Sequence, residues 1–358
     1  MKKTIGVIFG GRSTEHEVSV ESAKTVAEKL FLAGYAVKPV YIPQRGAWRL
    51  VDREAFVKKG ELKGEKVEPS FEKGSFMLRG KPLALDAIFP VVHGSTGEDG
   101  ILQGFLELLG LPYVGSGVLS SAVCMDKVLS KSIAAEHGLP VLPHVLVRSR
   151  DKKCVTAALR AARRLGMPLF VKPVRLGSSV GVVKVKRFGE LAKAVAFAFR
   201  FDSSIMIEKG VDRAREIVCG VLGSTSNARA SVAGEVRPKG KHEFFDYEAK
   251  YLDENGMDFI VPAGLSAVTT RKLREFSAVV FAALECHGLA RVDFFVDPRN
   301  EGKFYFGEIN TLPGFTSHSL YPTLWRNTGV DTIRLVDRLV KLAFERARGK
   351  SGLKTVRQ

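Results

Sequence analysis

The chain opens with a short apolar run that ends in two glycines, Thr4-Ile5-Gly6-Val7-Ile8-Phe9-Gly10-Gly11-Arg12. Such a run is typical of a buried strand, and the glycines end it. Ser13 follows and can cap a helix, which we expect over residues 14–33. A second apolar run at residues 36–42 completes a strand–helix–strand unit. This order predicts parallel strands, with the functional loops at their carboxyl ends.

The pattern that follows divides the chain into three parts. Residues 43–85 are rich in charge and alternate only briefly, as in hairpins on the flank of a domain. A strand at 86–92 and a helix at 99–109 complete the first part. One long helix is expected from residue 118 to about His137. We therefore expect an α/β fold with three domains, over residues 1–118, 119–212 and 213–358.

Short strands and helices are expected through the second and third parts. The strands fall near 141–147, 168–174, 180–186, 204–209, 215–223, 230–237, 289–297 and 303–309, and the helices near 152–165, 269–287 and 331–347. Residues 238–260 are polar and aromatic without a clear period, which is typical of a long functional loop.

Composition excludes several classes of protein. The chain of 358 residues is 45% hydrophobic and 26% charged, an ordinary balance for a folded protein. Its apolar runs are too short for a membrane span or a signal peptide, so we expect a cytoplasmic protein without a membrane partner. The cysteines are widely spaced, which speaks against a zinc site or a disulfide framework.

The net charge of 55 − 38 = +17 predicts an anionic partner. A phosphorylated small molecule and a nucleic acid both satisfy this expectation. Because no nucleic-acid-binding motif accompanies the charge, we favour the small molecule and expect no nucleic acid. A lysine-rich surface without any partner is the simpler alternative.

A glycine- and serine-rich segment, Gly177-Ser178-Ser179-Val180-Gly181, matches the Gly-x-Ser-x-Gly elbow of serine hydrolases. That elbow requires a helix directly after the serine. Here Val182-Val183-Lys184-Val185 predicts a strand instead, which disfavours a hydrolase acting through Ser179. We expect a turn between two strands, whose backbone N–H groups and hydroxyls can hold a phosphate chain.

Two carboxylates and a carboxamide are expected on one face of a hairpin. Side chains two residues apart lie on the same face of a strand. Arg291 and Asp293 should therefore point the same way, and so should Glu308 and Asn310. The turn at 297–302 places Asp293 opposite or diagonal to Glu308. These oxygen donors suit Mg²⁺. A solvated hairpin face with an Arg291–Asp293 ion pair is the alternative, although neighbouring phenylalanines favour burial.

Three lysines each follow an apolar run: Lys127, Lys172 and Lys209. A single lysine in such a position is usually a surface residue, but three that converge with a metal site indicate ligands of ATP phosphates. Glu208 and Glu216 lie at the ends of neighbouring strands. They are candidates for the adenine amine and the ribose hydroxyls.

Taken together, the motifs resemble those of the D-alanine–D-alanine ligase family of the ATP-grasp superfamily. The resemblance extends from Ile5 to about Gly329, and Ala214 departs from an expected glycine. The segments that carry it are 10–19, 93–100, 125–127, 172–181, 246–251, 308–314 and 316–319. It implies a three-domain ATP-grasp architecture with an N-terminal parallel-sheet domain, and it implies a homodimer.

The family resemblance implies an activity. The family uses ATP to join two D-alanines through an acyl phosphate, which supplies peptidoglycan precursors. The cofactors would be ATP and two Mg²⁺ ions, with Mn²⁺ as a substitute. Other ATP-grasp carboxylate–amine ligases, including D-alanine–D-lactate ligases, are the alternative, and Glu15 and Tyr251 argue against the more distant ones.

Residue roles follow from the same resemblance. Glu15 would hold the ammonium of the first D-alanine beside His93, while Arg291 and the N–H of Gly314 would form an oxyanion hole. The remaining roles concern binding and closure. Asp293, Glu308 and Asn310 would bind Mg²⁺; Lys127, Lys172 and Lys250 would neutralise phosphate; Ser319 would hold the second carboxylate; and Glu15, Ser178 and Tyr251 would close the loop at 238–260.

The hydroxyl of Tyr251 is expected to favour an amine at the second subsite. The unmodified enzyme should make D-alanyl-D-alanine and use negligible D-lactate at neutral pH, whereas Tyr251→Phe should admit D-lactate at mildly acidic pH. The reason is that D-alanine attacks as the neutral amine, which becomes scarce as the pH falls. Product analysis between about pH 6 and about pH 9 checks this. Efficient D-lactate use by the parent would contradict it, and a neutral effect of the phenylalanine would mean that Tyr251 only packs the loop.

Overall fold

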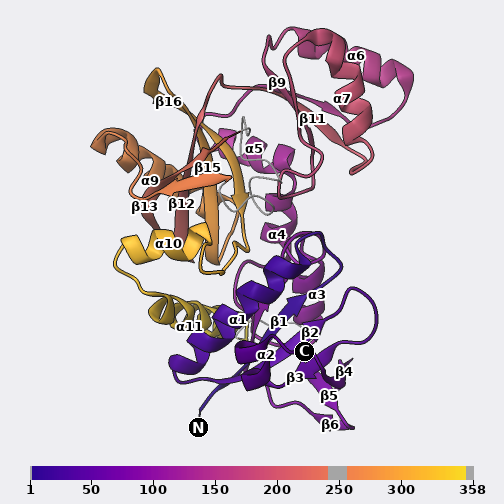
Figure 1. Cartoon of the computed structure of the whole chain (residues 1–358), viewed down its shortest axis with the longest axis vertical. Helices are drawn as coiled ribbons and strands as arrows, with labels where there is room; N and C mark the ends of the chain where they lie inside the picture. Colours follow the sequence, from indigo (N-terminus) through magenta and orange to yellow (C-terminus); the bar gives the residue numbers. More distant parts are fainter. Residues whose placement is uncertain (1, 241–255, 352–358) are drawn as a thin grey trace, which may run out of the picture.

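The computed structural model describes residues 2–240 and 256–351. Its described strands form three sheets: the sheet that contains β1 lies in the lower half of the molecule, and the other two lie beside each other in the upper half (Figure 1). A seven-stranded sheet has the order β6-β5-β4-β3-β2-β1-β7, a four-stranded sheet the order β10-β9-β11-β8, and a five-stranded sheet the order β14-β13-β12-β15-β16. The expected α/β class with an N-terminal parallel core is therefore confirmed.

The first sheet is built around the apolar run at the start of the chain. β1 (Thr4–Gly10) pairs in parallel with β2 (Ala36–Ile42) and β7 (Ala87–Val91), and α1 (His16–Leu32) connects β1 to β2. α3 (Ile101–Leu108) follows β7. The helix α1 begins two residues later than expected, because the Ser13 hydroxyl accepts a hydrogen bond from Glu15 N and so belongs to the preceding turn.

Antiparallel strands extend this sheet on one side, as the charged, weakly patterned segment predicted. They are β3 (Arg49–Val51), β4 (Gly64–Ser70), β5 (Ser75–Leu78) and β6 (Lys81–Pro82), with the helix α2 (Arg53–Lys59) between the first two. The helix α2 was not expected. The side chain of Asp52 accepts a hydrogen bond from Ala55 N at its start.

The expectation of one long helix after residue 118 was wrong. The chain forms α4 (Val118–Met125) and α5 (Lys127–Glu136), separated by Asp126 in an extended conformation. The Asp126 carboxylate accepts hydrogen bonds from Val128 N and Leu129 N, which caps the second helix. Lys127 therefore occupies the first turn of α5.

The second sheet contains β8 (His144–Val147), β9 (Leu169–Pro173), β10 (Val183–Val185) and β11 (Ile205–Lys209). The expected helix α6 (Lys152–Arg163) and an unexpected helix α7 (Leu191–Ala198) lie at the top of the molecule (Figure 1). The apolar core of this part joins β9 and β11 to the buried faces of both helices.

The third sheet contains β12 (Arg215–Ser224), β13 (Asn227–Pro238), β14 (Met257–Ile260), β15 (Gly288–Asp297) and β16 (Asn300–Asn310). The helices α9 (Ala267–Ala283) and α10 (Leu320–Asn327) accompany it. The hairpin register places Asp293 opposite Glu308 and Arg291 opposite Asn310. The expected cross-strand pairing is thus confirmed. Most of the expected loop at 238–260 lies outside the described residues, but the prediction was wrong at its end, because Met257–Ile260 form β14 and pair with β13.

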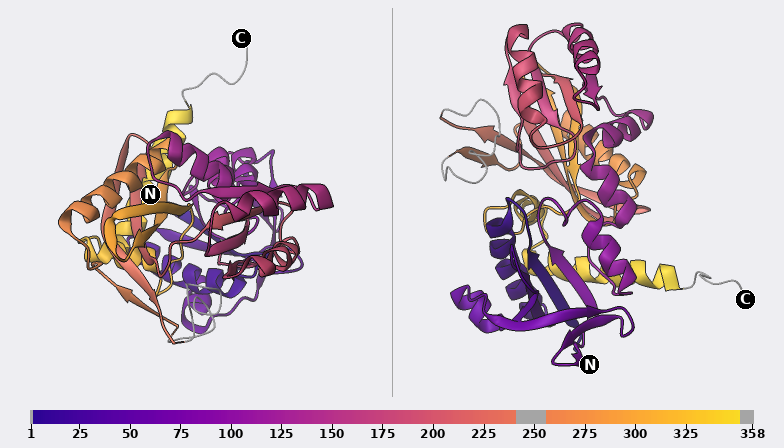
Figure 2. Two further views of the ribbon diagram at one scale, coloured as in Figure 1. Left: turned by 90° about the horizontal axis from the view of Figure 1, so that it is seen from above. Right: turned by 90° about the vertical axis from the view of Figure 1, so that its right-hand side faces the viewer.

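The last helix, α11 (Thr332–Ser351), packs on the first part of the chain. Its residues Leu335 and Leu339 share one buried core with Ile5 and Phe89. Tyr35 also donates a hydrogen bond to Asp337 over 2.9 Å. Each sheet falls within one of the three predicted domains. The helix α11, however, extends from the third part back to α1 (Figure 2). The domain boundaries themselves stay a prediction.

Over residues 2–240 and 256–351, none of the helices has both the length and the apolar character that crossing a membrane requires.

His287, between α9 and β15, generates a prediction for the pH dependence of folding. Burial is the main cause that lowers its pKa from 6.5 to about 4, and the positive charge of the nearby Arg346 adds to this effect. Its Nδ1 has no hydrogen-bond partner among the described residues. The unfolded chain therefore binds the proton more readily, so stability is complete above about pH 6.5 and falls toward about pH 4. The slope is at most about 1.4 kcal/mol per pH unit.

The variant His287→Leu should remove this loss, so the melting temperature of the parent should fall faster than that of the variant across this range. The exposed residue at the end of α5 provides a control, because His137→Leu should keep the parental slope. Equal slopes for the parent and His287→Leu would refute the assignment.

Candidate active site

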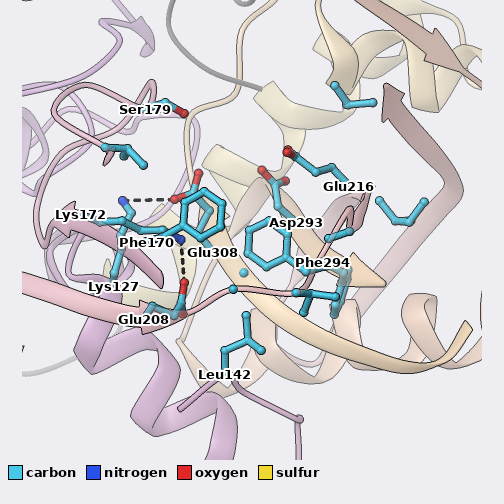
Figure 3. A pocket seen from close by; sticks show the side chains of 18 of the residues that line it. Lys127, Leu142, Phe170, Lys172, Ser179, Glu208, Glu216, Asp293, Phe294 and Glu308 are labelled. Atoms are coloured by element: carbon cyan, nitrogen blue, oxygen red, sulfur yellow. Dashed lines mark hydrogen bonds and ion pairs between the residues drawn. The ribbon is translucent and has the colours of Figure 1, made fainter. Parts of the chain in front are cut away.

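A pocket lies between the four-stranded and five-stranded sheets (Figure 3). Lysines line it from α5, β9, β10 and β11, and carboxylates from β11, β12, β15 and β16. Of the residues expected at an ATP site, those that line it are Lys127, Lys172, Ser179, Glu208, Lys209, Glu216, Asp293 and Glu308. Residues far apart in the sequence thus form one cavity, in which the four-stranded sheet contributes Lys172, Lys209 and Glu208, and the five-stranded sheet contributes Glu216, Asp293 and Glu308.

The metal-ligand candidates lie together on the β15–β16 hairpin. The two carboxylates are cross-strand partners, and Asn310 is held by a 2.8 Å hydrogen bond from Leu312 N to its side-chain oxygen. Two carboxylates and a carboxamide are hard oxygen donors that fit Mg²⁺. Among the described residues, no three His, Cys, Asp or Glu side chains form a metal-binding group. A metal here would therefore need further oxygens, such as those of a phosphate chain.

Both carboxylates also have cationic partners. Arg291 donates from Nε and Nη2 to the two oxygens of Asp293, each over 2.7 Å. Lys127 Nζ lies 3.2 Å from Glu308 Oε2. The ion pair considered as an alternative to a metal site is thus present, but the face is only partly solvated: the Arg291, Asp293 and Glu308 side chains are 15%, 22% and 32% exposed.

Glu208 occupies an unexpected position between two lysines. Its oxygens lie 2.8 Å from Lys131 Nζ and 2.6 Å from Lys172 Nζ, and its side chain is 1% exposed. Burial raises its pKa, but the two lysines outweigh this effect and lower the pKa to about 2. Glu208 therefore orients Lys172. Nothing in the sequence indicated that Lys131 is buried beside Glu208.

The two remaining nucleotide candidates lie at the pocket wall. Lys209 donates a hydrogen bond from Nζ to the carbonyl of Met167. Glu216 lies on β12, opposite Phe295 of β15, and its carboxylate lies on the same side of the pocket as Asp293 (Figure 3). The structure thus brings both residues to the pocket, with the amine of Lys209 bound to the backbone.

The glycine- and serine-rich turn connects β9 to β10, as expected. Ser178 and Ser179 both have left-handed backbone conformations, with φ of 54° and 57°. The next element is a strand, which excludes the strand–helix elbow of a serine hydrolase. Ser178 Oγ donates a 2.5 Å hydrogen bond to Glu15, so the turn reaches the first part of the chain.

His93 lies in a buried polar cluster next to that bond. Its Nε2 is 3.2 Å from Ser22 Oγ, and its Nδ1 is 3.1 Å from the carbonyl of Leu312. Glu98 lies 3.7 Å from His93 Nδ1, and burial raises its pKa. Glu98 had no expected role, although it follows the His93-Gly94 motif closely and its position could have indicated one.

Gly314 and Ser319 approach each other at the start of α10. A Cβ atom on Gly314 would lie only 2.8 Å from Ser319 Oγ, so a side chain at this position would crowd the hydroxyl. Ser319 Oγ accepts a 2.8 Å hydrogen bond from Thr316 N. The other two candidates, Lys250 and Tyr251, lie outside the described residues.

Two sheets that enclose a pocket lined by lysines and carboxylates define the ATP-grasp class of ligases. Family models for the D-Ala–D-Ala ligase N-terminus and C-terminus match residues 4–116 and 133–341. The chain belongs to the D-alanine–D-alanine ligase family. This membership confirms the expected enzyme class, an ATP-dependent ligase that forms a peptide bond and releases ADP.

Relatives match along nearly the whole chain. A D-alanine–D-alanine ligase of Thermoanaerobacter sp. (strain X514) is 43% identical over 354 residues, covering 96% of this chain and 97% of its own. D-alanine–D-alanine ligase A of Salmonella typhimurium is 40% identical over 367 residues, covering 99% of each chain.

Solved structures agree in fold. The D-alanine–D-alanine ligase of Coxiella burnetii is similar with a TM-score of 0.84 at 36% identity, covering 98% of this chain and 96% of its own. The VanG D-Ala:D-Ser ligase of Enterococcus faecalis is similar with a TM-score of 0.85 at 35% identity, covering 96% of this chain and 100% of its own.

Proposed function

We propose that this protein uses ATP to join two molecules of D-alanine into D-alanyl-D-alanine for peptidoglycan precursors. The observation that carries the proposal is the pocket in which Lys127 and Lys172 face Asp293 and Glu308. A carboxylate is a poor electrophile, so transfer of a phosphoryl group from ATP to the first D-alanine supplies a leaving group. The resulting acyl phosphate reacts with water, so the site must exclude solvent while the second amine attacks.

Asp293, Glu308 and Asn310 would hold one or two Mg²⁺ ions, with Mn²⁺ as a substitute. Such ions neutralise developing phosphate charge when they are bound. Lys127 and Lys172 contribute charge from the opposite wall, and the glycine- and serine-rich turn covers the phosphate chain with backbone N–H groups. Glu216 lies where it can accept hydrogen bonds from the ribose hydroxyls.

The amino-acid substrates would lie beside the bond between Glu15 and Ser178. Glu15 holds the ammonium of the first D-alanine, with His93 nearby. Arg291 and the N–H of Gly314 stabilise the oxyanion that forms when the second amine attacks. Ser319 binds the carboxylate of the second D-alanine, and its distance from a Cβ on Gly314 supports a shared subsite.

The second substrate is the part of the proposal that the fold leaves open. VanG shares the fold but is described as a D-Ala:D-Ser ligase. Phosphate release from ATP should therefore be measured with D-alanine, L-alanine, D-serine and D-lactate offered separately. Release that requires D-alanine, with D-alanyl-D-alanine as the product, supports the proposal. Equal release with L-alanine would sink it.

We further propose a homodimer that works in the cytoplasm, where ATP is available. The sulfur atoms of the buried Cys124 and Cys286 lie 3.6 Å apart without forming a disulfide, and a reducing compartment would keep such a pair as thiols. Sedimentation of the purified protein measures the oligomeric state directly.

The metal assignment predicts the effect of Glu308→Gln. The amide keeps the shape of the side chain but removes a negative ligand, so turnover should nearly vanish while the protein still folds. Steady-state ADP formation at saturating D-alanine measures this effect. The exposed residue on α9 supplies a control, because Glu275→Gln should leave turnover unchanged. Parental turnover by Glu308→Gln would show that Glu308 is no metal ligand.

The oxyanion assignment predicts the effect of Arg291→Ala. Losing one such donor costs on the order of 100-fold or more in kcat. The variant should therefore lose kcat more than it raises the KM for ATP. Because Arg291 also pairs with Asp293, the KM for ATP is measured alongside kcat. An effect confined to KM would instead place Arg291 in ground-state binding.

A further inference from the structure

A chain of three buried charges runs from α5 to the nucleotide pocket. Lys131 on α5 lies 2.8 Å from one oxygen of Glu208 on β11. The other oxygen of Glu208 accepts a 2.6 Å hydrogen bond from Lys172 on β9. Lys131 and Glu208 are each 1% exposed, and Lys172 is 13% exposed. Three separate elements thus contribute one charge each to a nearly dry cluster.

The three residues differ in their access to the pocket. Lys172 and Glu208 line it, whereas Lys131 is not among the described residues of its wall. The amine of Lys131 also donates a 2.9 Å hydrogen bond to the carbonyl of Phe306 on β16. Lys131 is therefore fixed to β16 on the side away from the pocket, and Glu208 lies between its amine and the pocket.

We propose that Lys131 is a positioning residue for ATP binding: it holds one oxygen of Glu208, so that the other oxygen orients the Lys172 amine toward the phosphate chain. This inference rests on the proposed function of the pocket as an ATP site. It assigns a role to a lysine that contacts neither substrate nor metal.

Charge balance gives the physical reason. Two lysines around one carboxylate leave a net positive charge beside the pocket, which favours a polyanionic ligand. With only Lys172 as a partner, the buried carboxylate would either bind that amine more tightly, which holds Lys172 back from ATP, or take up a proton, which leaves Lys172 without the charge that orients it. The structure supports a strong interaction, because Glu208 keeps a pKa of about 2 despite its burial.

A purely structural role is the alternative. The bond from Lys131 to the Phe306 carbonyl ties α5 to β16, and losing it would loosen the sheet. That role predicts lower stability with no specific change in nucleotide affinity. The two roles therefore differ in what they do to the dissociation constant of ATP.

The experiment measures ATP affinity by calorimetry without D-alanine, and KM and kcat with it. At metal sites, the residues that orient the ligands typically contribute about 10- to 100-fold to affinity, and we expect an effect of similar size for a residue that orients a phosphate-binding lysine. Lys131→Met should therefore raise the dissociation constant and KM for ATP at least about tenfold, with a smaller change in kcat. Lys131→Arg, which keeps the charge, should restore much of the affinity. Ser130→Ala is the control, because within residues 2–240 and 256–351 its hydroxyl donates a hydrogen bond to the carbonyl of Lys127 in the same helix and to no other group.

A double-mutant cycle with Glu208→Gln separates the two roles. If Lys131 acts through the carboxylate, Lys131→Met should change ATP affinity by less than about twofold in the Glu208→Gln background. Additive effects, or a Lys131→Met variant with parental affinity, would overturn the inference. If Lys131→Met alone fails to fold, Glu208→Gln is measured by itself: it should weaken ATP binding because Lys172 loses the carboxylate that orients it, and parental ATP affinity in that variant would overturn the inference. Failure of the parent to bind ATP would contradict the proposed function instead.

Discussion

Lys127 makes the contacts that join the two walls of the nucleotide pocket. Its backbone N–H donates to the carbonyl of Val174, and its amine donates to the carbonyl of Leu176 over 2.6 Å. The same amine lies 3.2 Å from Glu308 on the opposite sheet. Because its side chain is only 11% exposed, this ion pair is less screened than one on the surface. Asp126 sets the position of Lys127, because it ends α4 and caps α5 directly before this lysine.

The charges that line the pocket are complementary to those of a nucleotide with a bound metal. Lysines come from α5 and the four-stranded sheet, while Asp293 and Glu308 come from the five-stranded sheet. A nucleotide with its bound metal has the complementary arrangement of charge. Its phosphates attract the lysines, and the metal attracts the carboxylates. The Arg291–Asp293 and Lys127–Glu308 pairs keep the buried charges compensated within the protein itself.

A hydrogen bond connects the first part of the chain to the glycine- and serine-rich turn. The bond between Ser178 and Glu15 connects the turn after β9 to the N-terminus of α1. Two consecutive serines in the left-handed region cost of order 1 kcal/mol each or more, so the surrounding contacts must hold this turn in place. The solvent exclusion that the proposed reaction needs would therefore depend on contacts between parts of the chain that lie more than a hundred residues apart.

Short-range patterns in the chain determined its strands, the hairpin register and most candidate site residues. Asp293 faces Glu308 because a turn position sets the register of a hairpin. The break at Asp126 escaped this reasoning, since apolar periodicity continues across it and only the cap reveals it. Lys131 and Glu98 escaped it for another reason: burial of a charge depends on partners elsewhere in the chain, and a lysine on a helix looks the same whether it meets water or Glu208. The packing of α11 against α1 is of the same kind, because an apolar helix face does not specify which core it joins until the chain has folded.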